Sequence, residues 1–364
     1  MKLLVFPIDI DAGQRLAAEL SALGIPVVAA SSQVQTLSGS GYQDRVSLPY
    51  VTDETFARNL SELIRQKGIT HIYTHHQAVW TRLQSLLKAS PSLYPVELVQ
   101  PDPYERDWIR IAESLDWADQ IQSDDFTQML PDSNTPINHP PIDRSAIAGL
   151  HQQFLQIPGQ CDLTKLDALI HVVPLLPKGD LVEIGSLYGR SAYAMAWLAA
   201  RCRIGNLICV DPWSATRLED QGPASELINR DINSIDFEKI FQGFLCHLSL
   251  LPNAGYIRET SEDGYRVYQE AVKAGCLETP ELEHIPVQGR ISLLHIDANH
   301  DYRHVRQDIE LWEPLLASGG WVLLDDYIWS FGDGVKQAGD ELLARGGFDC
   351  AYVQGETLLL RKSS

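Results

Sequence analysis

The chain has 364 residues, of which 45% are hydrophobic, which is enough for two domains with cores of their own. Its formal charge of −19 argues against a nucleic-acid partner, because such a partner normally requires a basic face. The six cysteines form no Cys-x-x-Cys pair, and no apolar stretch approaches the roughly 20 residues of a membrane helix. We therefore expect a cytoplasmic protein without structural zinc, disulfides, nucleic acid or membrane partners.

Residues 1–102 are predicted to form a smaller, Rossmann-like α/β domain. Short strand patterns cover residues 2–6, 26–30 and 69–73. A helix between the last two presents Phe56, Leu60 and Leu63 on one face, with Thr52 or Asp53 as its expected cap and Gly68 at its end. No glycine-rich phosphate loop follows any of these strands, so nucleotide binding is not predicted there.

Residues 103–161 are predicted to be a helical segment followed by a proline-rich linker. Helical periodicity covers residues 104–121, and residues 131–141 have the composition of a linker. Helices over about 143–155 and 163–175 then precede the next strand. The sequence leaves open whether these helices form a lid or an oligomer contact.

A glycine loop follows the apolar strand that ends at Ile184. Gly185 and Gly189 frame the turn, and Ser186 and Ser191 lie in and after it. Glycines let a ligand approach the main chain, but the Gly-x-x-x-Gly spacing is neither the dinucleotide fingerprint nor a P-loop. A cofactor loop and a plain tight turn both agree with this pattern.

Two further strands end in polar groups that suit a nucleoside. The strand over 207–210 is followed by Asp211, whose carboxylate can accept hydrogen bonds from both ribose hydroxyls. The strand over 254–258 leads into residues 259–263, where Ser261 is among the groups expected near an adenine.

Three carboxylates follow the next two strands. Asp297 follows a strand over 291–296, and Asp325 and Asp326 follow a strand over 321–324. Between them a helix is predicted with Val305, Ile309, Trp312 and Leu316 on one face and Gly319-Gly320 at its end. Converging acids favour a divalent metal, and their hard oxygens favour Mg²⁺, Mn²⁺ or Ca²⁺ over zinc. The alternative is that Asp301 or Asp325 caps a helix.

These motifs together resemble the class I S-adenosylmethionine-dependent methyltransferases. The resemblance rests on Glu-Ile-Gly-Ser-x-x-Gly-Arg-Ser, Val-Asp-Pro-Trp, His-Ile-Asp-x-x-His-x-Tyr and Leu-Leu-Asp-Asp-Tyr and covers about residues 162–362, within a predicted methyltransferase domain over 162–364. It is nearest to the cation-dependent O-methyltransferases of macrolide, sugar and cephamycin biosynthesis. It implies an α/β fold whose C-terminal Rossmann-like sheet has helices on both faces and follows the smaller N-terminal α/β domain.

The resemblance also implies the roles of individual residues. The metal ligands would be Asp297, Asp325 and Asp326, and His300 would stand where catechol-type enzymes carry a lysine. The contacts to S-adenosylmethionine would come from Glu183, Gly185, Ser186, Gly189, Ser191, Asp211, Ser261 and Asp297.

The predicted reaction is transfer of a methyl group to a hydroxyl of a small molecule such as a sugar or polyketide. Asp297 and His300 are the predicted catalytic residues, with His300 as general base, because an imidazole titrates near neutral pH. A capping or supporting role is the alternative for His300, and a packed role is expected for His295. The oligomeric state is left open. Two rival functions are a nicotinamide-dependent oxidoreductase and a non-catalytic binding protein on the same fold.

Overall fold

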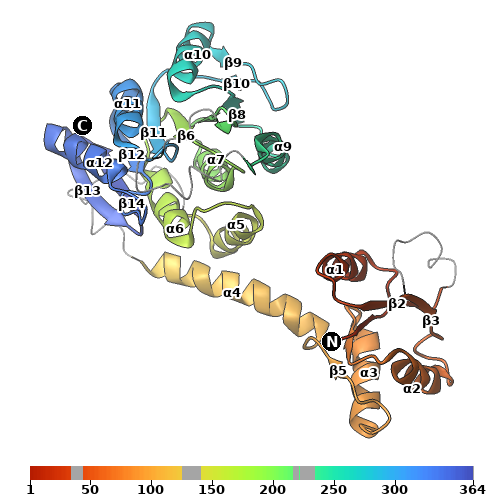
Figure 1. Cartoon of the computed structure of the whole chain (residues 1–364). Coiled ribbons are helices and arrows are strands. Elements are labelled where there is room, and N and C mark those ends of the chain that lie inside the picture. The colour runs from red at the N-terminus through yellow and green to blue at the C-terminus, as the bar shows by residue number, and fades with distance from the viewer. Residues whose placement is uncertain (34–43, 125–140, 216–220, 222–233, 364) are drawn as a thin grey trace. The chain divides into compact units, whose positions relative to one another are not determined.

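The computed structural model describes residues 1–33, 44–124, 141–215, 221 and 234–363 (Figure 1). The chain divides into two compact units, Met1–Glu113 and Ser114–Ser364. The predicted linker over 131–141 lies outside the described residues except for Pro141. Within the described ranges, no helix combines the length and the apolar character needed to cross a membrane.

The first unit is built on a parallel sheet of five strands in the order β3-β2-β1-β4-β5. Its elements are β1 (Leu3–Val5), α1 (Asp11–Ala22), β2 (Val27–Ser31), β3 (Asp44–Ser47), α2 (Phe56–Lys67), β4 (His71–Tyr73), α3 (Gln77–Ala89) and β5 (Glu97–Leu98), and α4 (Pro103–Ser123) follows. Helix α2 ends at Gly68, whose φ of 63° is left-handed, as predicted. Its N-cap is Thr55, because Asp53 instead accepts hydrogen bonds from the Thr55 amide and hydroxyl.

The second unit contains a sheet of seven strands in the order β13-β14-β12-β11-β6-β7-β8. Its helices are α5 (Arg144–Gln156), α6 (Leu163–Val172), α7 (Arg190–Cys202), α9 (Phe237–Leu248), α10 (Ser261–Ala274), α11 (Tyr302–Trp312) and α12 (Gly334–Arg345), with 3-10 turns at Val173–Leu175 and Glu313–Leu315. Its strands are β6 (Asp180–Ile184), β7 (Leu207–Val210), β8 (Ala254–Ile257), β11 (Ile291–Ile296), β12 (Leu316–Leu324), β13 (Phe348–Gln354) and β14 (Thr357–Lys362), with a separate pair β9 (Cys276–Leu277) and β10 (Ile285–Pro286).

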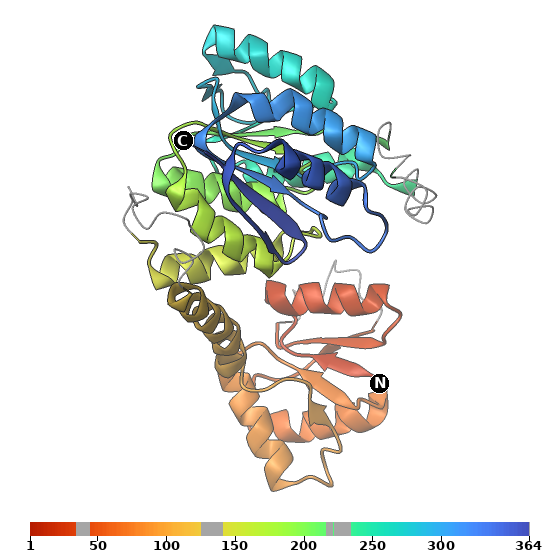
Figure 2. The ribbon, with the colours of Figure 1, turned by 90° about the vertical axis from the view of Figure 1, so that its left-hand side faces the viewer.

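Helices cover both faces of this sheet, which confirms the predicted Rossmann-like architecture. Neighbouring residues of one strand belong to different cores: Leu181 packs with α5, α6, α7 and α9, whereas Val182 packs with α10, α11 and α12. Figure 2 shows the yellow-green helices on one face and the cyan to blue helices on the other. The alternation follows from the two-residue period of a strand.

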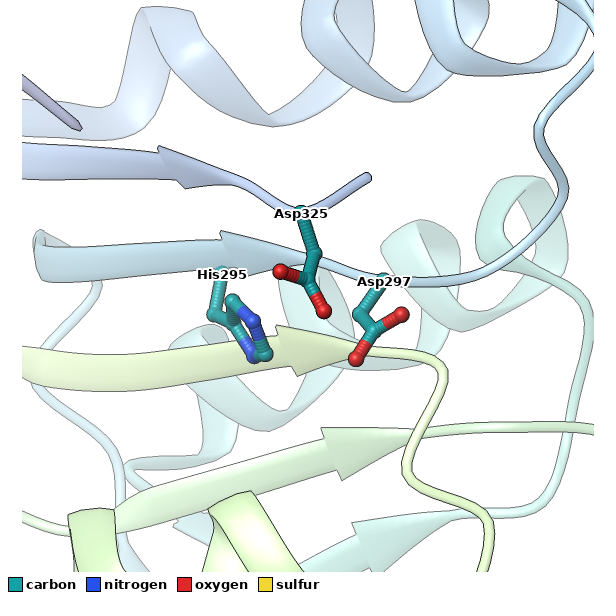
Figure 3. A group of neighbouring side chains, drawn as sticks. All are labelled: His295, Asp297 and Asp325. Atoms are coloured by element: carbon teal, nitrogen blue, oxygen red, sulfur yellow. The ribbon is translucent and has the colours of Figure 1, made fainter. Parts of the chain in front are cut away.

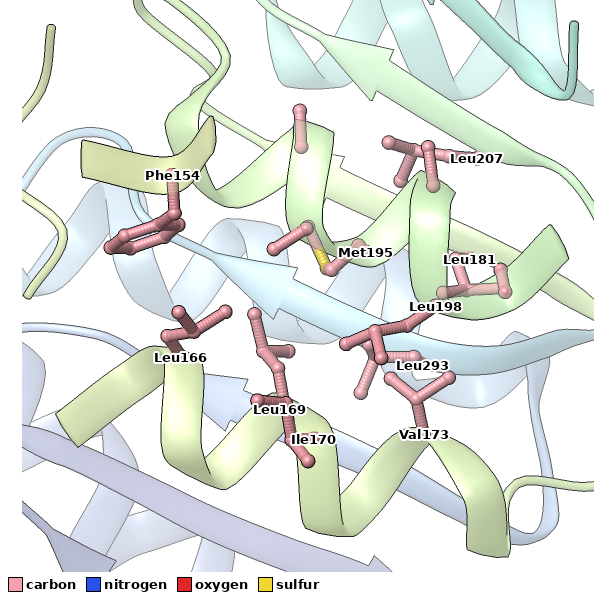
Figure 4. Packing of buried hydrophobic residues seen from close by; sticks show 14 of the residues in the cluster. Phe154, Leu166, Leu169, Ile170, Val173, Leu181, Met195, Leu198, Leu207 and Leu293 are labelled. Carbon is pink, nitrogen blue, oxygen red and sulfur yellow. The ribbon is translucent and has the colours of Figure 1, made fainter. Parts of the chain in front are cut away.

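Helices α5 and α6 contribute to the core of the second unit. Figure 4 shows Leu166, Leu169 and Val173 directed at α7 and at the strands, where Met195 and Leu293 meet them. The predicted domain boundaries at residues 102 and 162 stay predictions. The packing shows, however, that α5, which they assign to the intervening segment, shares a core with the second unit.

The helix between β11 and β12 is shorter than predicted. Val305, Ile309 and Trp312 face the core as expected, but α11 ends at Trp312 and Leu316 already lies in β12. Pro314 lacks an amide hydrogen and cannot continue an α-helix. Gly319-Gly320 therefore lies inside β12. The N-cap at Asp301 is confirmed, because its carboxylate accepts from the Arg303 amide at 3.0 Å.

The packing of α6 predicts a large stability loss in Leu169→Ala. Leu169 is 1% exposed, and truncating a buried leucine lowers the free energy of unfolding by about 2–5 kcal/mol. Leu250→Ala is the matched control, since Leu250 is 87% exposed and its truncation should change the same quantity by less than about 0.5 kcal/mol. Urea unfolding followed by tryptophan fluorescence measures both. Equal effects of the two substitutions would contradict the packing of α6.

Candidate active site

The chemically active side chains lie on the face of the sheet that α6 and α7 cover. His295 of β11 pairs in register with Glu183 of β6 and with Leu323 of β12. Side chains two residues apart share a face, so Asp297 follows His295 and Asp325 follows Leu323 onto the same side. Figure 3 shows His295, Asp297 and Asp325 grouped at the carboxyl ends of these strands. The sheet thus brings together the acids that the sequence predicted to converge.

A lysine from α6 lies between two of these acids. Lys165 Nζ is 3.2 Å from Asp297 Oδ2 and donates a hydrogen bond to Asp325 Oδ2. The residue is 2% exposed. The Asp162 carboxylate caps the start of α6 by accepting from the Lys165 amide at 2.9 Å, which fixes where the helix begins and where the lysine points.

The pairing of Lys165 with the acids favours the charged forms of Lys165 and Asp297, although burial disfavours them. Burial lowers the pKa of Lys165, but attraction to Asp297 outweighs it, so the pKa lies above its ordinary value. Burial likewise raises the pKa of Asp297, and neighbouring positive charge, that of Lys165 above all, outweighs this effect and holds the pKa below its ordinary value. Both groups are therefore charged at neutral pH.

Glu183 anchors a fully buried network behind the glycine loop. Its Oε1 accepts from the Ser191 hydroxyl at 2.6 Å and contacts His295 Nδ1 at 3.0 Å, and its Oε2 accepts from the Ser186 hydroxyl at 2.6 Å. Cys209 Sγ is 3.8 Å from Oε2. Glu183 is 0% exposed, so it acts on the loop through the two serines.

Gly185 is the position where the loop after β6 touches the end of β11. Its φ is +84°, and a Cβ there would lie 2.0 Å from the Asp297 carbonyl oxygen. Glycine therefore serves both the left-handed conformation and the close approach. Gly189 is also left-handed, with a φ of +82°, and it packs under α9, where a Cβ would lie 2.7 Å from Leu248 Cδ2.

Asp211 at the end of β7 organises the same loop. Its Oδ2 accepts from the Ser186 and Leu187 amides at 2.9 and 3.1 Å, and its Oδ1 accepts from the Trp213 amide at 2.7 Å. A carboxylate can accept about four hydrogen bonds, so one position remains for a ligand hydroxyl rather than the two of the prediction. Burial raises the pKa of Asp211 above its ordinary value, against the lowering effect of the three amides.

Three non-glycine residues with left-handed backbone lie at the carboxyl end of this sheet. Leu187, Trp213 and Asp326 follow β6, β7 and β12 and have φ values of 47°, 42° and 54°. Such conformations cost about 1–3 kcal/mol each and cluster at functional sites. The left-handed turn at Asp326 separates two successive carboxylates. Asp325 lies beside Lys165, and Asp326 lies beside His300.

His300 lies between Gln221 and Asp326. Its Nδ1 contacts Gln221 Oε1, which as a carbonyl oxygen can only accept, so the ring proton is placed on Nδ1. Nε2 is 2.7 Å from Asp326 Oδ2 but has no partner with hydrogen-bond geometry among the described residues. The Trp329 ring packs on the imidazole with centroids 4.2 Å apart. Nε2 is thus the ring nitrogen left to accept a proton.

One cavity of about 790 Å³ connects these groups. The predicted site residues that line it are Gly185, Ser186, Ser191, Asp211, Ser261, Asp297, His300, Asp325 and Asp326. Glu183 and Gly189 do not line it, because the first is buried beneath the loop and the second begins α7. A cavity of this size suits a cofactor-sized ligand.

Two residues that line the cavity, Lys165 and Gln221, have no role assigned from the sequence. Lys165 shares its helix face with Ala168, Leu169 and Val172, and a lysine in such an apolar stripe is the signal that could have indicated it. His304 is half-buried and also lines the cavity.

Comparison with known proteins identifies the domain that carries this site. Residues 182–327 match a family model described as a methyltransferase domain. A search of curated protein sequences finds no match. The matched segment runs from β6 to the residue after Asp326, so it contains the glycine loop, Asp211, the acids and His300.

Solved structures of methyltransferases are among those similar to the chain. The O-methyltransferase NovP is 16% identical, with 56% of this chain and 81% of NovP covered and a TM-score of 0.40. The calicheamicin methyltransferase CalS11 is 15% identical, with 72% and 94% covered and a TM-score of 0.40. MycE from the mycinamycin pathway, solved with Mg, SAH and mycinamycin VI, is 14% identical, with 62% and 55% covered and a TM-score of 0.36. Likeness at this level supports no argument about substrate or metal.

The contact at Gly185 predicts that Gly185→Ala destabilises the second unit. The new Cβ would meet the Asp297 backbone, which cannot move away as a flexible side chain would, in a conformation that alanine disfavours. We expect the free energy of unfolding to fall by about 2 kcal/mol or more. Gly149→Ala in the interior of α5 is the control, since nothing lies within 4 Å of its added Cβ and it should raise stability by about 0.5–1 kcal/mol. A neutral Gly185→Ala in chemical unfolding would refute the close approach.

Proposed function

We propose that the second unit is an S-adenosylmethionine-dependent methyltransferase that methylates a hydroxyl oxygen of a small molecule. One observation carries the proposal. A single cavity joins the glycine loop and Asp211, which suit a nucleoside, to Asp297, His300 and Asp326, which suit a hydroxyl that must lose its proton. The acceptor class we propose is a hydroxylated natural product such as a sugar or polyketide.

The loop after β6 and the end of β7 fit the cofactor. Gly185, Ser186 and Ser261 line the cavity, and Asp211 has one acceptor position left for a ribose hydroxyl. Glu183 holds Ser186 and Ser191 from behind and supports the predicted cofactor contacts rather than making one. When bound, S-adenosylmethionine supplies a sulfonium methyl group that is already a good electrophile. The protein therefore mainly has to align an oxygen and remove its proton.

His300 is the group that we propose takes this proton. Gln221 accepts from Nδ1, so Nε2 is the ring nitrogen that would take up the proton, and Trp329 packs on the ring. The oxygen of the acceptor bonds to the methyl carbon as the bond from that carbon to sulfur breaks, and the hydroxyl proton moves to Nε2. The Asp326 carboxylate, 2.7 Å away, stabilises the imidazolium that results.

The predicted Mg²⁺ site at Asp297, Asp325 and Asp326 stays a prediction. Donor atoms of Asp297, His300 and Asp326 lie within 4.8 Å of one another, and carboxylate oxygens are suitable ligands. However, Asp325 Oδ1 accepts from the Thr357 hydroxyl at 2.6 Å, and Lys165 bonds Asp325 Oδ2 and contacts Asp297 Oδ2. In this arrangement the three acids do not fit a divalent ion, and the proton transfer above involves side chains alone.

Binding of S-adenosylhomocysteine tests the cofactor site through Asp211. Asp211→Asn should weaken binding by about 10- to 100-fold at neutral pH, because a hydrogen bond to a charged acceptor is lost. In the wild-type chain, affinity should fall as the pH falls, since protonation removes the acceptor. The fall should begin above the pH range of an ordinary aspartate, whose pKa is 3.8, because burial raises the pKa of Asp211.

Isothermal titration over a pH series measures both effects, with Glu270→Gln on the exposed face of α10 as the charge-matched control. An absence of binding by the wild-type chain would refute the proposed function. Equal affinity of Asp211→Asn would refute the assignment of Asp211.

Replacement of His300 tests the proposed base. With an acceptor found by transfer of labelled methyl groups, His300→Ala should lower kcat by about 100- to 10,000-fold and leave cofactor affinity within about threefold, because a general base acts on the acceptor proton. His284→Ala, on an exposed histidine, is the control. A kcat unchanged in His300→Ala would show that another group takes the proton.

A further inference from the structure

The ammonium group of Lys165 is a buried charge in the second unit. The Lys165 side chain is 3% exposed, whereas those of its partners Asp297 and Asp325 are 26% and 12% exposed. Lysine is almost never fully buried unless it is paired, and here its partners are two of the three acids expected to hold a metal. The cation next to these acids is thus supplied by the protein.

Both oxygens of Asp325 are already used. Oδ2 accepts from Lys165 and Oδ1 accepts from the Thr357 hydroxyl on β14 at 2.6 Å. Mg²⁺ demands near-ideal octahedral geometry with ligands about 2.0–2.1 Å away, so it would have to take oxygens that now accept hydrogen bonds. It would also have to lie next to an ammonium of the same sign, in a site that water screens poorly.

The backbone holds the lysine where it is. Asp162 caps α6 through the Lys165 amide, and Leu166 and Leu169 fix the helix against α7 and the sheet. In the same turn, the Thr164 hydroxyl donates a hydrogen bond to the Asp162 carboxylate at 2.7 Å. Moving Lys165 away from the acids would therefore require the ammonium to leave both carboxylate partners, either by turning into the cavity that Lys165 lines or by displacement of a packed helix.

We propose that Lys165 is the resident cation of the Asp297–Asp325 pair and replaces a divalent metal in methyl transfer. Lys165 is a positioning residue: its ammonium neutralises the pair and orients the Asp297 carboxylate toward the cavity beside His300. This inference rests on the proposed function and deepens it, since it names the group that neutralises the acids of the same site. Methyl transfer should accordingly not need added metal.

Manganese binding tests the role of Lys165 without an acceptor. The wild-type chain should bind Mn²⁺ no more tightly than millimolar in titrations followed by electron paramagnetic resonance, and chelator should leave its S-adenosylhomocysteine affinity unchanged. Lys165→Met, which keeps the stem and removes the charge, should lower Tm by about 5–15 °C, because two half-buried acids lose their partner. It should bind Mn²⁺ at least tenfold more tightly than the wild type, and Mn²⁺ should restore part of the Tm.

The double variant Lys165→Met with Asp325→Asn separates charge from packing. Removing one acid should recover part of the Tm lost in Lys165→Met and abolish the gained Mn²⁺ site, whereas Lys273→Met on the exposed end of α10 should change neither quantity. A packing role alone would leave the double variant as unstable as the single one.

Micromolar binding of one Mn²⁺ by the wild-type chain, lost in Asp325→Asn, would overturn the proposal even if Lys165→Met fails to fold. Failure to bind S-adenosylhomocysteine would instead refute the proposed function, so the two failures can be told apart.

Discussion

An ammonium group held between two carboxylates joins three parts of the second unit that are distant in sequence. Lys165 comes from the first turn of α6, Asp297 follows β11 and Asp325 follows β12. Lys165 is 2% exposed, and leaving such a buried charge without its partners would cost about 3–5 kcal/mol. Mutual neutralisation therefore stabilises the acids at the strand ends next to the cavity, while apolar packing holds α6 on the sheet.

Because side chains alternate between the two faces of a strand, the polar groups around Lys165 lie on one face of the sheet. Glu183, His295, Asp297 and Asp325 share one face, so a buried network under the glycine loop continues directly into the charged cluster. The opposite face is apolar and packs on α10, α11 and α12. Left-handed residues after β6, β7 and β12 then turn the chain sharply at the strand ends, where ligands bind in open α/β sheets.

Features carried by local pattern could be predicted from the sequence. Buried strands ending in Asp211, Asp297 and Asp325, the glycine loop and the core face of α11 all have such patterns, and the structure shows them. The Lys165 contacts could not be found this way, because they join residues 132 and 160 positions apart. The number of donors already bound to Glu183 and Asp211 likewise depends on loop conformation, which a motif does not state. The early end of α11 could have been predicted from Pro314, which cannot continue an α-helix.

The most direct test of this account is a crystal structure of the full chain with S-adenosylhomocysteine, grown with Mg²⁺ present. The account predicts the product in the cavity with a ribose hydroxyl bonded to Asp211. It also predicts His300 Nε2 beside Asp326 and next to the space left for the acceptor, and Lys165 Nζ between Asp297 and Asp325. A product bound elsewhere would contradict the proposed function. An octahedral ion on Asp297, Asp325 and Asp326, with Lys165 turned away, would contradict the role assigned to the lysine.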